Sequence, residues 1–326
     1  MAENKKYDVT ALGELLIDFI PYEVTAKGNP AFEANPGGAP CNVLSMLTRF
    51  GRKVAFVGKV GEDFFGHQLK EAVEEQGILT QGLILDKEVH TTLAFVSKKP
   101  NGDREFSFYR NPGADMMLKA EEIDEDLIRG AKLFHFGSLS MTDEPVRSAT
   151  MRALALARES GALISFDPNL REPLWKSLDE AKEQIAIGMQ HCDIMKISDN
   201  EIQWFTGEDD FDKGIEILRK TYPNIRLICL SIGPEGSRAY CGEHFAEVAA
   251  FVNENTVETT GAGDTFCANV LDYVLGHGLD ALDDAALAEM LLRANAAASI
   301  VTTKLGALRV MPTPEEIEAY IKKCGR

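Results

Sequence analysis

The residues best suited to chemistry gather at 258–266, the stretch Glu-Thr-Thr-Gly-Ala-Gly-Asp-Thr-Phe. Two glycines and an alanine leave the backbone uncovered, so a charged group can come close to main-chain N–H donors. Apolar side chains then recur at Phe266, Val270 and Val274, a spacing of four that predicts a helix packed on a core. The uncovered stretch is therefore expected at a helix N-terminus, where unpaired N–H groups and the helix dipole bind anions, above all phosphate.

Asp264 lies within this expected anion site, where its charge would repel a bound phosphate. A catalytic role would explain an aspartate at this position: Asp264 would be a general base that takes a hydroxyl proton as phosphate arrives. The alternative is an ordinary aspartate in the first turn of a helix. Short glycine motifs are common, so this stretch alone does not decide between the two interpretations.

Composition excludes several classes of function. The chain has 326 residues and a net charge of −17, which argues against a nucleic-acid partner. The first residues, MAENKKYDVT, lack the apolar core of a signal peptide, and no run approaches about 18 apolar residues, so we expect no membrane span. The six cysteines form no C-x-x-C pair, which favours buried free thiols in a reducing compartment. We therefore expect a cytoplasmic protein.

Strands alternate with helices through most of the chain. Apolar runs predict a β-rich segment at 7–20 and strands at 54–58, 133–136, 162–166, 194–197 and 227–231. Helical periodicity predicts helices after 36–40 and at 64–76, 145–160, 178–191, 210–221, 283–300 and 314–323. This alternation predicts βαβ crossovers and a mostly parallel sheet covered by helices on both faces.

A second, smaller β unit is expected beside this sheet. Residues 91–98 and 104–110 are β-rich, and Pro100-Asn101-Gly102-Asp103 between them has the composition of a hairpin turn. No helix separates the two segments, so they should stand apart from a parallel sheet. We expect one α/β domain, residues 1–326, with a small β-sheet lid formed by about 14–36 and 88–112.

Ligands of such sheets bind beyond the carboxyl ends of the strands. Five stretches with polar or glycine residues follow or end an expected strand: Asp18, 37–38, 167–171, 196–201 and 231–233. Any one of them is also what an ordinary turn looks like. Five on one rim predict a binding site.

The motifs as a set resemble a known family. The chain lacks a Gly-x4-Gly-Lys-Ser/Thr loop and a Gly-x-Gly-x-x-Gly turn after a strand, which argues against a P-loop enzyme and a dinucleotide dehydrogenase. It instead resembles the ribokinase-like (phosphofructokinase-B-type) carbohydrate kinases, most closely the fructokinases, over about residues 8–320. The stretches that carry this resemblance are Gly-Gly-Ala-Pro-Cys-Asn at 37–42, Gly-Glu-Asp-Phe-Phe-Gly at 61–66, 106–115, 134–138, 166–171 and 259–264.

The resemblance implies a ribokinase-like α/β fold and a role for each matching residue. Asp264 would deprotonate the primary hydroxyl of a sugar, while the N–H groups of Gly261, Ala262 and Gly263 stabilise charge in the transition state. The positions that match sugar contacts in the family are Asp18, Gly38, Asn42, Phe95, Phe108, Arg110 and Arg171. For Phe95 and Phe108 the alternative is packing between the lid and its neighbour, and for Arg110 and Arg171 it is a surface or structural ion pair.

Further positions match the family's nucleotide and metal contacts. Those expected at ATP are Lys196, Glu201, Ser231, Gly233, Gly236 and Asn295. Glu201 would act on Mg²⁺ through water, and Glu258 and Thr260 would lie at a K⁺ site. Ser198 replaces the asparagine of the family's Asn-x-x-Glu motif, as it does in some fructokinases. Glu258 stands where aspartate is usual near the family's monovalent-cation site, so the requirement for K⁺ is open.

The resemblance implies ATP-dependent phosphorylation of D-fructose at O6. The same chemistry on ribose, 2-keto-3-deoxygluconate or aminoimidazole riboside is an alternative, and Arg110 with Arg171 could clamp a carboxylate substrate. A non-catalytic sugar-binding regulator on the same fold is an alternative of another class, which should have lost the base or the anion site. We expect the lid to close over the sugar and, through its exposed strand edges, to pair two subunits into a homodimer.

Overall fold

Nine strands form the central sheet of the computed structural model, which describes residues 5–98 and 104–326. Their order is β13 (His244–Val248), β12 (Ser237–Cys241), β11 (Leu227–Ser231), β10 (Ile194–Ser198), β9 (Leu163–Asp167), β8 (Ala131–Gly137), β1 (Tyr7–Leu12), β4 (Val54–Gly61) and β5 (Leu79–Asp86). All neighbours from β11 to β5 pair in parallel, and β12 and β13 add an antiparallel edge. The predicted mostly parallel sheet is confirmed.

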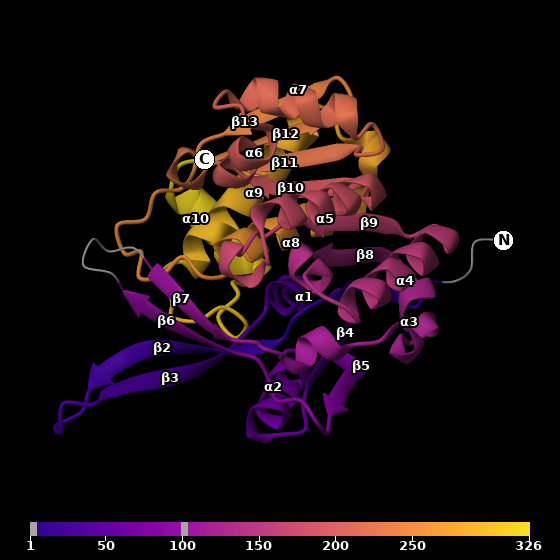
Figure 1. Ribbon diagram of the computed structural model, residues 1–326. Coiled ribbons are helices and arrows are strands. Elements are labelled where there is room, and N and C mark those ends of the chain that lie inside the picture. The colour runs from indigo at the N-terminus through magenta and orange to yellow at the C-terminus, as the bar shows by residue number, and fades with distance from the viewer. Residues whose placement is uncertain (1–4, 99–103) are drawn as a thin grey trace.

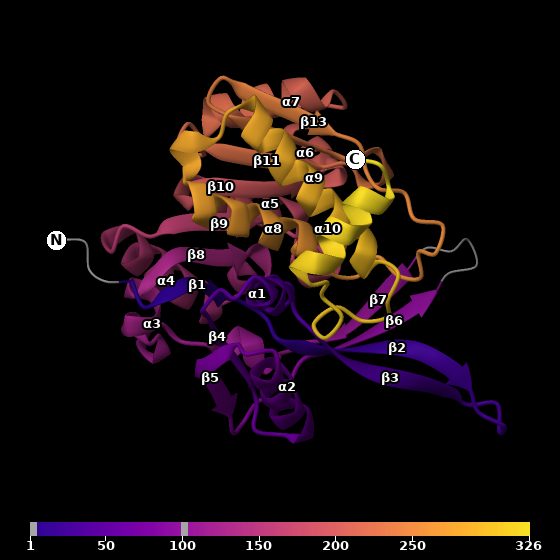
Figure 2. The same ribbon diagram turned by 180° about the vertical axis from the view of Figure 1, so that it is seen from behind.

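Helices cover both faces of this sheet (Figures 1 and 2). One face carries α1 (Ala39–Arg49), α2 (Phe64–Glu75), α8 (Ala262–His277), α9 (Asp284–Val301) and α10 (Pro314–Lys323). The other carries α3 (Glu125–Arg129), α4 (Val146–Glu159), α5 (Leu178–His191), α6 (Asp199–Thr206) and α7 (Phe211–Thr221). No helix in the described ranges is long and apolar enough to cross a membrane.

The strands are apolar on both sides because each side faces a helix layer. In β11, Leu227 and Cys229 belong to the core under α8 and α9, whereas Ile228 and Leu230 belong to the core under α5 to α7. Successive residues of a strand point to opposite faces, so a buried parallel strand needs apolar residues at every position.

A separate four-stranded sheet, the lid sheet, projects from the body (Figure 1). Its order is β3 (Pro30–Gly37), β2 (Leu16–Val24), β6 (Leu93–Lys98) and β7 (Arg104–Tyr109). The strands fall within the two ranges expected for a lid, apart from the last residue of β3. The expected turn at Pro100–Asp103 lies outside the described residues.

Several elements differ from the sequence prediction. The β-rich segment 7–20 divides into β1 of the central sheet and β2 of the lid sheet. Between them Gly13 passes so close to α1 that a Cβ there would lie 2.6 Å from Cγ of Pro40. Strand β5 and helices α3 and α6 were not predicted, although α6 begins with a capping box in which the Ser198 and Glu201 side chains satisfy each other's backbone N–H groups.

Candidate active site

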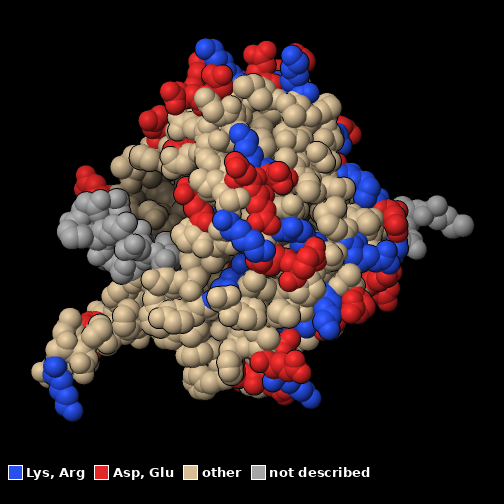
Figure 3. Space-filling model, in the orientation of Figure 1, with Lys and Arg blue, Asp and Glu red and all other residues tan. Residues whose placement is uncertain are grey.

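Helices α1 and α8 both begin at one cavity of about 530 Å³. The first turn of α1 contributes Ala39 and Asn42 to its wall, and the first turn of α8 contributes Gly263 and Asp264. Figure 3 shows the surface hollowed where the body faces the lid sheet. The N-terminus of α8 offers backbone N–H groups and a partial positive charge to an anionic group at this end of the cavity, whereas α1 has Pro40 in its first turn and so offers fewer donors.

Glycine is required at the N-cap of each helix. Gly38 has a φ of 125°, and a Cβ there would clash with the carbonyl oxygen of Glu14. Gly261 has a φ of 79°, and a Cβ there would lie 2.6 Å from Cβ of Ala307. Both conformations are strained for residues with a side chain, so glycine allows the two helices to begin here.

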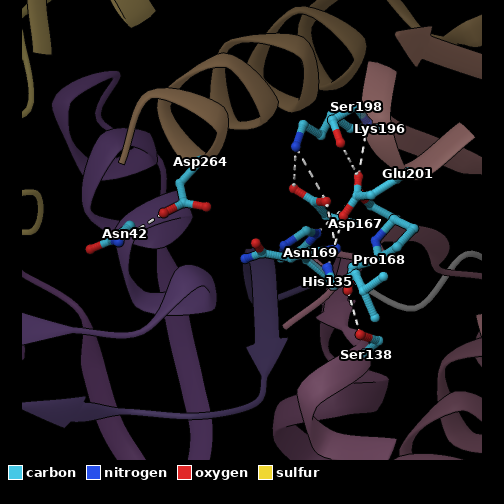
Figure 4. A network of polar contacts seen from close by, with 12 residues as sticks. Asn42, His135, Ser138, Asp167, Pro168, Asn169, Lys196, Ser198, Glu201 and Asp264 are labelled. Carbon is cyan, nitrogen blue, oxygen red and sulfur yellow. Dashed lines mark hydrogen bonds and ion pairs between the residues drawn. The ribbon is translucent and has the colours of Figure 1, made fainter. Parts of the chain in front are cut away.

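Asp264 is held at the junction of the two helices. Nδ2 of Asn42 on α1 donates to Oδ2 of Asp264 at 2.8 Å, and only 9% of Asp264 is exposed. In Figure 4 its second carboxylate oxygen points away from Asn42. Burial raises the pKa of Asp264, although the Asn42 amide and the cations Lys196 and Arg171 oppose this. A raised pKa moves a carboxylate toward the range in which it accepts a proton effectively at neutral pH.

The lid sheet supplies the opposite wall of the cavity. Asp18 on β2 is in register with Ala94 on β6, which is in register with Phe108 on β7, so these three residues share one face of the lid sheet. Burial and the charges of Glu258 and Asp264 raise the pKa of Asp18 to about 7, while Arg171 opposes the shift. Of the residues expected at a sugar, five line the cavity: Asp18, Gly38, Asn42, Phe108 and Arg171.

Two residues expected at the sugar do not line this cavity. Phe95 is in register with Phe19, and their rings stack with centroids 4.6 Å apart on the other face of the lid sheet. Arg110 donates to Asp115 at 2.7 Å and, at 3.0 Å each, to Thr142 and the carbonyl of Leu139. Phe95 thus packs within the lid sheet and Arg110 forms a structural ion pair, as the alternatives given for these residues describe, and their contacts with a sugar stay predictions.

A second cavity of about 340 Å³ lies on the other side of the α8 N-terminus. Thr259 lines both cavities, while Ala262 faces the second one together with Gly233, Phe251 and Asn295. The Asn295 side chain accepts from Ser237 Oγ and donates to the Val248 carbonyl, both at 2.9 Å. The anion site at the start of α8 therefore lies between a polar cavity and a more apolar one.

The other residues expected at a nucleotide are placed differently. Lys196 lines the first cavity, whereas Ser231 and Gly236 line neither cavity and lie on either side of the turn that carries Gly233. Glu201 accepts from the backbone N–H of Leu170 and from the N–H and hydroxyl of Ser198, each at 2.8 Å. Both of its carboxylate oxygens thus have protein donors, which favours action on a metal through water.

No cluster of three or more His, Cys, Asp or Glu suited to a metal ion occurs within 5–98 and 104–326. Glu258 and Thr260, the expected K⁺ residues, are neighbours: Thr260 Oγ1 donates to Glu258 at 2.6 Å, and the Gly306 N–H donates to the other carboxylate oxygen at 3.1 Å. This carboxylate therefore joins the loop before α8 to the loop at Gly306.

Sequence reasoning missed Glu14, which lies between β1 and β2 and lines the first cavity. Its Oε1 accepts the N–H of Ala39 at 2.8 Å and so caps α1 from outside that helix. Burial raises the pKa of Glu14 to about 7, although hydrogen bonds from its own amide and that of Ala39 oppose the shift. The pair Gly13-Glu14 interrupts an apolar run, which was the available signal that the predicted strand 7–20 ends there.

Known proteins resemble this chain over nearly its whole length. The model of the pfkB family of carbohydrate kinases matches residues 6–314. "Probable fructokinase-4" of Arabidopsis thaliana is 41% identical over 323 residues, which cover 98% of this chain and 98% of the relative. The solved structure of a fructokinase from Xylella fastidiosa with bound ATP has a TM-score of 0.89 at 27% identity and covers 98% of this chain and 99% of that one. A fructokinase from Vibrio cholerae O395 with fructose, ADP and calcium has a TM-score of 0.86 at 27% identity, covering 97% and 99%.

The N-cap glycine of α8 gives a direct test of this geometry. Gly261→Ala and Gly207→Ala both place alanine in the left-handed region, at a φ of 79° and 76°, but only the first meets a neighbour, since nothing lies within 4 Å of a Cβ at Gly207, the C-cap of α6. We expect about 1–2 kcal/mol of backbone strain in both variants and about 1–3 kcal/mol of further loss in Gly261→Ala from overpacking against Ala307. Urea unfolding measures both, and equal losses would contradict the close approach at Ala307.

Proposed function

The chain belongs to the pfkB family of carbohydrate kinases, and we propose that it is an ATP-dependent fructokinase, which phosphorylates D-fructose to fructose 6-phosphate. The observation that carries this proposal is the position of Asp264 at the start of α8, where the two cavities meet. Phosphoryl transfer needs an acceptor hydroxyl and a phosphate in line, with a base beside the hydroxyl.

The first cavity is the proposed sugar site. Asp18, Gly38 and Asn42 would bind hydroxyl groups, since a carboxylate and an amide can accept from and donate to neighbouring hydroxyls of a polyol. Phe108 would cover an apolar face of the sugar, and Arg171 would add a charged donor. Asp264 would take the proton of the O6 hydroxyl while the N–H groups of 261–263 stabilise the charge of the transferred group.

The second cavity is the proposed site of the nucleotide base. Asn295 and the turn with Ser231, Gly233 and Gly236 would surround the nucleotide, and Lys196 would meet its phosphates. Mg²⁺, when bound to the triphosphate, spreads its negative charge, and Glu201 would orient the waters of that ion. Glu258 and Thr260 remain the proposed residues of a K⁺ site.

Arg110 bears on the choice of acceptor. A carboxylate substrate such as 2-keto-3-deoxygluconate would have been held by Arg110 and Arg171 together, but the Arg110 guanidinium is engaged by Asp115, Thr142 and Leu139. This favours a neutral sugar, and ribose and aminoimidazole riboside are the alternatives of that kind. A non-catalytic regulator is disfavoured because Asp264 and the glycines of the anion site are intact.

A coupled kinase assay on these four acceptors tests the proposal. We expect kcat/KM to be highest with D-fructose, and a higher value with ribose, 2-keto-3-deoxygluconate or aminoimidazole riboside would reassign the substrate. Absence of ADP release with all four would favour the regulator.

The same assay in KCl and in NaCl tests the proposed K⁺ site at Glu258 and Thr260. We expect faster turnover in KCl, and equal rates in the two salts would exclude a role for K⁺.

Replacing the proposed base tests the mechanism. Asp264→Asn should lower kcat at least about 10²-fold and leave KM for fructose nearly unchanged, because the amide keeps the shape but accepts no proton. Asp272→Asn is a matched control, since Asp272 lies on the same helix and lines neither cavity. Its carboxylate pairs with Arg52 at 2.6 Å. Turnover of Asp264→Asn close to that of Asp272→Asn would exclude Asp264 as the base.

The outer face of the lid sheet supports a homodimer. Phe19, Phe32, Phe95 and Tyr109 form a ring cluster there, and Tyr109 and Phe32 are 66% and 39% exposed. In Figure 3 most charged side chains lie on the body, and the projecting lid sheet is largely uncharged. An apolar face of this kind on a projecting sheet fits a second copy of the chain.

The buried thiols of Cys41, Cys192, Cys229 and Cys267 support the proposed cytoplasmic location.

Sedimentation velocity at micromolar concentration tests the homodimer. We expect a dimer for the natural protein and a monomer for Tyr109→Lys, since a buried lysine without a partner is costly at an interface. Val252→Lys is the control, because Val252 is an exposed apolar residue of the body (77% exposed). A monomeric natural protein, or a dimer that Tyr109→Lys leaves intact, would contradict pairing through the lid sheet.

A further inference from the structure

An ion pair of Lys196 and Asp167 is buried beside the two cavities. The residues lie on the neighbouring parallel strands β10 and β9, and Nζ of Lys196 is 3.1 Å and 3.4 Å from the two carboxylate oxygens of Asp167 (Figure 4). Lys196 is 7% exposed and Asp167 is 3% exposed. Neither charge is therefore compensated by bulk water.

Lys196 reaches the anion site at the start of α8. A Cβ on Gly263 would lie 3.2 Å from Nζ of Lys196, so the ammonium group is directly beside the uncovered backbone of the α8 N-terminus. Lys196 lines the first cavity, whereas Asp167 does not and instead lines a small enclosed space behind it. The ammonium group thus lies between a carboxylate on the protein side and the place where phosphate is proposed to arrive.

The surroundings of Lys196 explain how a buried lysine stays charged. Burial would lower the pKa of Lys196, but the carboxylates of Asp167 and Glu201 outweigh that effect and raise it. Glu201 has three hydrogen-bond donors of its own, from Leu170 and Ser198. Asp167 is the acid that contacts the ammonium group directly.

We propose that Asp167 is a positioning residue, whose carboxylate holds Lys196 charged and aimed at the phosphoryl group above Gly263. The proposal rests on the proposed function, in which phosphate passes the α8 N-terminus. Nζ carries three donors, and the two oxygens of Asp167 face it from one side only. The ammonium group can therefore meet a phosphoryl oxygen without breaking the pair. Asp167 acts through Lys196 and does not touch the substrate.

A purely structural role for Asp167 is the competing explanation. Its Oδ1 also accepts the N–H of Asn169 at 3.1 Å, which orders the turn after β9. That turn carries Asn169 and Arg171, both of which line the sugar cavity. A structural role therefore predicts damage to sugar binding that does not depend on Lys196, and the proposal predicts the opposite.

A double-mutant cycle of Asp167→Asn, Lys196→Met and the double variant separates the two roles. We expect Asp167→Asn to lower kcat/KM for ATP about 10²-fold, as misplacement of a charged group does, with KM for fructose within about twofold of the natural value. In the Lys196→Met background the same substitution should change kcat/KM less than about twofold. A further loss as large as in the natural background, or a rise in KM for fructose, would overturn the proposal.

Each single variant breaks the buried ion pair and is expected to lose stability, so the cycle is run at a temperature below the unfolding transition of all three variants. Asp167→Glu, which keeps the negative charge on a longer side chain, replaces Asp167→Asn in the cycle if Asp167→Asn does not fold. The same dependence on Lys196 is expected of it. Asp193→Asn is the control: Asp193 precedes β10 and accepts the Ile164 N–H of β9 at 2.8 Å, at the opposite end of the same strands. It should lose stability and keep its kinetic constants.

Nucleotide affinity separates failure of this proposal from failure of the proposed function. If the natural protein phosphorylates none of the four acceptors, calorimetric titration with a non-hydrolysable ATP analogue, without sugar, gives the Kd of the natural protein, the two single variants and the double variant. We expect Asp167→Asn to weaken analogue binding only when Lys196 is present. Weakening of the same size in the Lys196→Met background, or none in either background, would refute the role of Asp167 whichever acceptor is used.

Discussion

The site depends on one constraint: a buried carboxylate must be kept where two helix N-termini meet. Asp264 lies in the first turn of α8 and takes its hydrogen bond from Asn42 in the first turn of α1. Removing a carboxylate from water is costly unless donors and positive charge replace the water. The two helix N-termini, Asn42, Lys196 and Arg171 provide both. The N-cap glycines follow from this, since each helix can begin beside the cavity only if its N-cap has no side chain.

Acidic side chains outnumber basic ones around the first cavity, and this limits where a phosphate could bind. Glu14, Asp18 and Asp264 all line it, and burial raises the pKa of each. These acids suit hydroxyl groups and oppose a second anion, which fits a neutral sugar. Positive potential is concentrated at the start of α8 and at Lys196, where a phosphate would lie. In a chain with a net charge of −17, such local charge is what makes nucleotide binding favourable.

Much of this architecture could be predicted from the sequence, because it rests on local patterns. Helices α5 and α10 begin and end at the predicted residues, since each has a strong cap and a clear apolar face. The start of α8 was predicted from its glycines and the apolar spacing after Phe266. Which residues of the lid sheet face the cavity was not predicted. The face on which Phe95 lies depends on the register between β2 and β6, and no local pattern encodes that register. Two of the three partners of Arg110, Leu139 and Thr142, are also distant in sequence, about 30 residues away, whereas Asp115 is only five residues away.

The most direct test of the central claim is a crystal structure of the protein with D-fructose and a non-hydrolysable ATP analogue. The account predicts that the O6 hydroxyl lies within about 3.2 Å of the Asp264 carboxylate, as a general base requires. The terminal phosphate of the analogue should lie against the N–H groups of 261–263 and near Nζ of Lys196. A fructose whose primary hydroxyls are out of reach of Asp264, with the phosphate away from the start of α8, would contradict the account.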